Sequence, residues 1–142
     1  KSILMYKKYL KKIIAKDIQG LQLISACCSE AKVKIEDIKF LKNNNIFLLS
    51  LERFNREKDK NNEKINSICK FEFVDGVKSK NIDQNNKDKI IELLAIDLFK
   101  KGKNYEITLL FQNNGFITLS TEIVEVTLED QNKKKNDESI RL

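Results

Sequence analysis

The sequence predicts an α+β fold, in which one curved antiparallel β-sheet or partly open β-barrel of about six or seven strands carries an N-terminal helix packed on it. Most segments alternate apolar and polar residues with a period of two, which is typical of half-buried strands. Residues 18–29 instead place their apolar residues at helical spacing. The 142 residues suffice to bury a core, so we expect a single domain over residues 1–142.

The beginning of the chain predicts a short strand and then the helix. Residues 1–16 are basic and apolar by turns, and we expect 1–9 to be a loosely attached segment packed on the domain. A membrane-surface amphipathic helix is the alternative. Residues 11–15 fit a short strand, and Asp17 is a good N-cap for a helix lying across the sheet. The stripe on that helix consists of Ile18, Leu21, Ile24, Ser25 and Cys28.

The first long strand changes its phase part of the way along. Val33 and Ile35 share one parity, whereas Ile38 and Phe40 carry the opposite parity. Because successive side chains of a strand point to opposite faces, a β-bulge near Asp37 would keep both pairs on one face.

Two further strands follow a turn. The asparagines of 42–45 tolerate left-handed conformations and predict that turn. Residues 46–54 begin apolar on both faces, which indicates a central strand. The polar run 55–64 predicts an exposed, mobile loop. Residues 65–74 return to strand, and the side chains predicted to face the core there are those of Cys69, Phe71 and Phe73.

The segment 90–99 fits either a helix or a strand. It follows a short strand continuation at 77–82 and a polar loop at 81–89. A strand is favoured, because a tight turn at Lys101-Gly102 would pair apolar residues throughout. That turn would set Leu98, Ile96 and Leu94 opposite Tyr105, Ile107 and Leu109, respectively.

A β-hairpin over residues 105–123 organises the C-terminal half. A three-residue loop of Asn113, Asn114 and Gly115 would set Phe111 opposite Ile117, with the apolar residues on one face. In that register Gly115 is the left-handed residue and Asn114 is right-handed. The strand then continues as one long element beyond a bulge or bend near residue 123, and 131–142 is expected to be a solvated tail.

Composition favours a non-catalytic protein. The chain has no histidine, which removes the commonest general base, and its four glycines are isolated, so it has no phosphate-binding loop. We expect no cofactor and no metal, because Cys27, Cys28 and Cys69 lack metal-binding spacing and are interpreted as free thiols. No apolar run is long enough to span a membrane, so the expected location is the cytoplasm.

Four basic residues are candidate binding residues. Arg53 shares the parity of the apolar residues on its strand, so its guanidinium should be partly buried against a carboxylate, Glu122 or Asp37. An anion contact is the alternative. Lys70, Lys78 and Lys80 belong to a larger set that could share one sheet face and contact phosphate. The other members of that set are Lys32, Lys34 and Lys39.

Several short blocks resemble an uncharacterised, chiefly alphaproteobacterial family, domain of unknown function 2948. The blocks are Leu21–Ala26, Phe47–Phe54, Leu93–Ile96, Asn114–Leu119 and Glu125–Asp130, and their order and spacing carry the resemblance, which covers roughly residues 10–130. It implies a bacterial origin and no known activity, and it supplies no catalytic residues.

Two hypotheses for function follow. The first is a non-catalytic binding or assembly module, whose exposed strand edges could pair with a second copy to form a homodimer. The second is a nucleic-acid-binding protein that uses the lysine-rich sheet face. The net charge of +6 comes almost entirely from lysine, which we interpret in part as codon bias from an AT-rich genome, so it is weak support for the second hypothesis. Against that hypothesis, Phe71, Phe73 and Phe111 are predicted to be core residues rather than a stacking platform.

Overall fold

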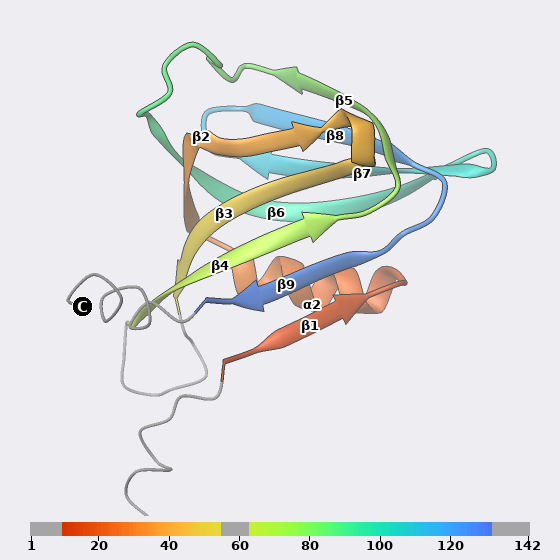
Figure 1. Ribbon diagram of the computed structural model, residues 1–142, viewed down its shortest axis with the longest axis horizontal. Coiled ribbons are helices and arrows are strands. Elements are labelled where there is room, and N and C mark those ends of the chain that lie inside the picture. Colours follow the sequence, from red (N-terminus) through yellow and green to blue (C-terminus); the bar gives the residue numbers. More distant parts are fainter. Residues whose placement is uncertain (1–9, 55–62, 132–142) are drawn as a thin grey trace, which may run out of the picture.

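The computed structural model describes residues 10–54 and 63–131. These residues form one helix and one antiparallel sheet of nine strands in the order β1-β9-β4-β3-β2-β6-β7-β8-β5. The sheet is open and strongly curved (Figure 1). The elements are β1 (Lys12–Ala15), α2 (Ile18–Cys28), β2 (Ala31–Leu41), the 3-10 turn η1 (Lys42–Asn44), β3 (Ile46–Phe54), β4 (Lys64–Phe71), β5 (Val74–Lys80), β6 (Ile90–Lys101), β7 (Asn104–Phe111), β8 (Gly115–Thr121) and β9 (Val126–Asp130).

The α+β class and the antiparallel sheet are confirmed, but six or seven strands was wrong. The stretch after the hairpin, predicted as one long strand, is divided at residues 122–125 into β8 and β9, which lie far apart in the sheet order. The bend predicted near Ile123 is therefore a connection that leads from β8, near one end of the sheet, to β9, near the other end. The expectations for 1–9, for 55–62 and for 132–142 lie outside the described residues.

Helix α2 forms where its cap and stripe predict it. Asp17 accepts a hydrogen bond from the Gly20 N–H at 2.9 Å. Leu21, Ile24 and Cys28 are fully buried, and the helix packs mainly on β6 and β1, behind β9 in Figure 1. The hydroxyl of Ser25 accepts a bond at 2.9 Å from the N–H of Ile96, beside the register shift in β6.

The segment 90–101 is a strand, and the predicted bulge in β2 is present between Val33 and Ile38. The partners predicted for β6 were wrong by two residues, since Leu98 lies opposite Ile107 rather than Tyr105. The two-residue turn lies at 102–103 rather than at 101–102, with a left-handed Gly102 at φ 62°. A shift of two residues leaves Ile96 and Leu98 on their predicted face. Leu94, predicted on that face too, is instead 39% exposed, because the register shift between Leu93 and Ala95 changes the parity there.

The β7–β8 hairpin was also predicted two residues out of register. Phe111 lies opposite Gly115, and the loop consists of Gln112, Asn113 and Asn114. Both asparagines are left-handed, at φ 62° and 60°, whereas Gly115 is not. The glycine serves a close approach instead, because a Cβ at that position would lie 3.2 Å from Ile82 Cγ1. Asparagine tolerates the left-handed region, so the loop needs no glycine there.

The prediction that Phe73 faces the core was wrong. Strand β4 pairs with β9 and β5 pairs with β8, so the chain must turn between them at residues 72–73. Phe73 takes φ 60° at this corner and is 44% exposed. The next residue, Val74, donates its N–H to the carbonyl of Asn45 at 2.8 Å, which fixes the corner against the β2–β3 turn. Phe71 and Phe111 are buried, as predicted.

Candidate binding site

A cavity of about 460 Å³ opens on the concave side of the sheet, between β2 and β5. Apolar side chains from four strands and from the loop between β5 and β6 form most of its wall, and a few polar residues lie among them. The lining residues are Ile35, Glu36, Ile38, Phe40, Phe47, Val77, Ser79, Ile82, Gln84, Lys87 and Ile117.

The bulge in β2 explains why the cavity is there. Pairing between β2 and β6 runs from Ala31 to Lys34, and beyond the bulge β2 continues against β3. The change of parity turns Ile38 and Phe40 toward the same space as Ile35. Strand β5 is the last strand in the sheet order, separated from β2 by three strands. Because the sheet curves, residues of β5 and of β2 line the same space.

The loop between β5 and β6 borders this space and is fastened at both sides. Gln84 donates its side-chain amide to the Ser79 hydroxyl at 2.7 Å. On the opposite side, the Glu36 N–H donates to the Lys87 carbonyl at 3.0 Å. The Asn81 amide donates to the Asn114 carbonyl at 2.8 Å, which joins the loop to the β7–β8 hairpin. The loop therefore lies in a defined position beside the cavity.

The wall of the cavity is incompletely packed. Phe47 and Ile117 in this wall are buried. Four other apolar side chains of the wall pack against the core but remain partly exposed: Ile38, Phe40, Val77 and Ile82. Protein interiors are close-packed, and voids larger than a water molecule are few. An apolar space of this size at the mouth of a curved sheet can hold a small ligand.

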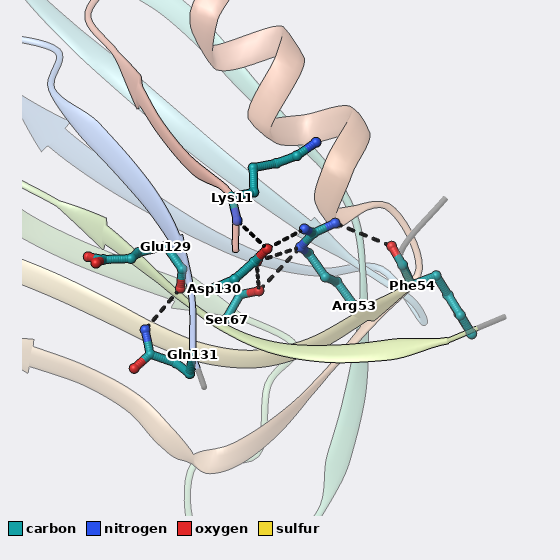
Figure 2. Close-up of polar contacts among 7 residues, drawn as sticks. All are labelled: Lys11, Arg53, Phe54, Ser67, Glu129, Asp130 and Gln131. Carbon is teal, nitrogen blue, oxygen red and sulfur yellow. Dashed lines mark hydrogen bonds and ion pairs between the residues drawn. The ribbon is translucent and has the colours of Figure 1, made fainter. Parts of the chain in front are cut away.

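Arg53 lies at the far end of β3, in a buried polar cluster (Figure 2). Its Nη2 donates to Asp130 Oδ2 at 2.9 Å, and its Nε donates to Asp130 Oδ1 at 3.1 Å. Ser67 donates its hydroxyl to Asp130 Oδ1 at 2.6 Å, and the Lys11 N–H donates to Oδ2 at 3.0 Å. The cluster joins β3, β4 and β9 to the residue that precedes β1. The predicted burial of Arg53 against a carboxylate is confirmed, but Glu122 and Asp37 were the wrong partners.

The environment of Asp130 decides its ionisation. Burial by itself raises the pKa of this carboxyl group. The hydrogen bonds from Arg53, Ser67 and the Lys11 N–H, together with the charge of Arg53, outweigh burial and leave the pKa below its ordinary value. Asp130 is therefore a carboxylate at neutral pH, and it neutralises the buried guanidinium.

The predicted lysines do not form one uniform set. Lys70 on β4 pairs with Glu72 at 3.2 Å, while Lys78 and Lys80 are exposed on the end strand β5. Five strands separate β4 from β5 in the sheet order. On β2, Lys32 pairs with Glu92 at 2.9 Å and Lys34 with Glu36 at 3.7 Å. Glutamates thus share the surface with three of these lysines.

The three cysteines are free thiols. Cys28 at the end of α2 and Cys69 on β4 are buried, and a hydrogen bond between them, burial and the charge of Cys28 all raise the pKa of Cys69. Within 10–54 and 63–131, no group of three or more histidine, cysteine, aspartate or glutamate residues could hold a metal ion. No helix in that part of the chain is long and apolar enough to cross a membrane.

Sequence reasoning assigned no binding role to the residues that line the cavity. Val77 and Ser79 lie on the short strand β5. The lining residues come from segments far apart in the sequence, so they form no sequence motif. One signal was available, because Ile82 is an apolar residue inside the otherwise polar run 81–89. Its side chain lines the cavity and takes up the space beside Gly115, where a Cβ would lie 3.2 Å from Ile82 Cγ1.

Comparison with known proteins places the chain in a family whose role is open. A family described as "Protein of unknown function (DUF2948)" matches residues 11–140. No curated protein and no solved structure matches the chain. The matched region includes every strand and the helix. The chain belongs to this family of proteins of unknown function, as the order of its short sequence blocks implied.

Proposed function

We propose that this protein is a non-catalytic binding module, and that the cavity between β2 and β5 holds a small, mostly apolar ligand. The observation that carries the proposal is the incompletely packed apolar wall around about 460 Å³. Ligand sites in proteins are concave, fall in this range of volumes, and combine apolar walls with a few polar groups. Ile38, Phe40, Val77 and Ile82 would lose their remaining exposure on binding.

The arrangement of charges supports binding rather than chemistry at this site. The buried ion pair of Arg53 and Asp130 lies at the other end of β3, away from the cavity, and its two charges pair with each other. The polar residues of the cavity are one glutamate, one serine, one glutamine and one lysine at its border. Such groups can orient a ligand whose affinity comes from the apolar wall.

A neutral apolar dye tests the proposal. N-phenyl-1-naphthylamine gains fluorescence in apolar surroundings, and we expect saturable one-to-one binding to the protein. Val77→Phe fills the cavity from β5 and should weaken binding at least about tenfold, since a bulky ring displaces the dye. Lys78→Phe is the matched control, because it adds the same ring to the neighbouring, exposed position of the same strand.

The same dye titrations can also contradict the proposal. Both variants are first checked by circular dichroism and thermal unfolding. Absence of saturable dye binding to the wild-type protein, or equal binding by the two folded variants, would contradict a ligand site in this cavity.

We favour the ligand-binding form of the module over assembly through a strand edge. The end strand β1 has four residues, and the end strand β5 carries a register shift at Gly76 and the lysines at 78 and 80. Short strands, bulges and edge lysines are features that oppose pairing between sheets. Light scattering at tens of micromolar protein addresses assembly directly, and a homodimer there would favour the assembly form.

Nucleic-acid binding is the weaker proposal. Lys32, Lys34 and Lys70 have glutamate partners, so phosphate would compete with those carboxylates for half of the six lysines. A real phosphate-binding face would give an affinity for random oligonucleotides that falls steeply as salt rises.

A further inference from the structure

We infer that the ligand of the cavity is an anionic amphiphile, such as a medium-chain carboxylate, with its chain in the apolar wall and its head group beside Lys87. This inference rests on the proposed function, because it concerns the same cavity. It adds the chemical class of the ligand and the residue that selects it.

The apolar part of the cavity fits an alkyl chain. Ile38 and Phe40 line it from β2, and Val77 and Ile82 line it from the opposite side. These four side chains are partly buried, so a flexible chain between them would complete their packing. Burial of each methylene group contributes roughly 0.8 kcal/mol, which corresponds to about fourfold in affinity.

The charges at the border of the cavity decide the head group. Two charged residues line it, Glu36 and Lys87. The Glu36 carboxylate has a cationic neighbour already, Lys34, at 3.7 Å. Within the described residues, no carboxylate forms a salt bridge with Lys87. The ammonium group is therefore the charge that lacks compensation, and it favours a negative head group.

The position of Lys87 is fixed by its backbone. Its carbonyl accepts the Glu36 N–H at 3.0 Å, which attaches the residue to β2 at the border of the cavity. Ser79 and Gln84 lie on the opposite side, joined to each other at 2.7 Å.

Competition against N-phenyl-1-naphthylamine tests the inference with three ligands of equal chain length: octanoate, octanol and octyltrimethylammonium. We expect octanoate to bind about three- to fivefold more tightly than octanol, the range of an exposed ion pair, and octyltrimethylammonium to bind most weakly. Affinity should rise about fourfold per methylene from hexanoate to decanoate. The preference for octanoate should shrink between about 50 mM and about 500 mM salt.

Lys87→Gln supplies the decisive variant. It should remove the preference for octanoate over octanol and leave the affinity for octanol unchanged. Lys89→Gln removes the same charge from the same loop, at a residue that does not line the cavity, and should keep the preference. Equal binding of octanoate and octanol by the wild-type protein, or a preference for the ammonium ligand, would overturn the inference while the binding cavity itself stands. Failure of all three ligands and of the dye would overturn the proposed function as well.

Discussion

Strand β3 joins two ends of the sheet that are built in opposite ways. Arg53, near its last residue, is closed within a polar cluster, and the side chains of Arg53 and Asp130 are each 1% exposed. Phe47, near its first residue, borders the cavity, where neighbouring apolar side chains stay partly exposed. The two residues are six positions apart, which is about 20 Å of extended strand. The Arg53 end of the strand therefore stabilises the fold, and the Phe47 end borders a space that a ligand can fill.

Removing one partner of the buried ion pair should give the greatest loss of stability. Asp130→Asn removes the carboxylate that accepts two hydrogen bonds from the buried Arg53 guanidinium, and we expect the free energy of unfolding to fall by about 3–5 kcal/mol. Glu129→Gln is the control, since it removes the same charge from the adjacent, exposed position of β9. It should change the free energy by no more than about 0.5 kcal/mol. Urea unfolding measures both, and equal losses would contradict the assigned contrast between the two ends.

The same pair predicts how stability depends on acid. Because the pKa of Asp130 is lowered in the folded protein, the unfolded chain binds this proton more readily. The stabilisation is fully present above the ordinary aspartate pKa of about 3.9 and is lost as the pH falls through the lowered folded value. The difference in unfolding free energy between wild type and Asp130→Asn should therefore narrow below about pH 4. A difference that stays constant down to about pH 2 would contradict this assignment.

The hairpin turn beside the cavity should show an intermediate effect. Asn114 has φ 60°, so Asn114→Ala places a residue with poor tolerance in the left-handed region, at a cost of about 1 kcal/mol. Asn114→Gly should cost little, because glycine adopts this conformation freely. Gln112→Ala, in the same loop without a positive φ, is the control. Thermal unfolding compares the three, and a neutral Asn114→Ala would contradict the observed register.

Adding one methylene group should have small effects of opposite sign at the two kinds of site. Val77 lines the cavity, whereas Val126 is fully buried in the packed core. Val77→Ile gains apolar contact and should be neutral or stabilising by up to about 0.8 kcal/mol. Val126→Ile overpacks its surroundings and should cost about 1 kcal/mol. Both changes keep a β-branched residue on a strand, so equal effects in urea unfolding would argue against free space beside Val77.

Local patterns in the sequence predicted the elements but not their partners. The cap at Asp17, the bulge in β2 and the strand at 90–101 all follow from the period and chemistry of nearby residues. Both predicted registers were wrong by two residues, because a shift of two preserves the apolar face and leaves the pattern unchanged. The position of the turn decides between such registers, since both turns have their predicted length and lie one residue away from the predicted place. In the β7–β8 loop the left-handed residue at the end is Asn114 rather than Gly115.

Long-range pairing limited what could be predicted of the site. Parity placed Arg53 in the core, but its carboxylate partner depends on β9 lying beside β4, and several carboxylates in the chain were equivalent candidates. Phe73 follows the alternation of β4 and is nevertheless exposed, since the chain changes flanks there. The cavity arises from the curve of the whole sheet, which no single segment encodes.

The pairing of β9 between β1 and β4 has a consequence for synthesis of the chain. Asp130 follows Arg53 by 77 residues, so a growing chain carries the guanidinium and Ser67 long before their carboxylate is made. Strand β1 cannot pair in the sheet until the same segment is made, because its partner is β9. During synthesis, β1, the strand of this sheet that comes first along the chain, is thus among the last to be fixed in place, and the edge of β4 stays uncovered until residues 126–130 are made.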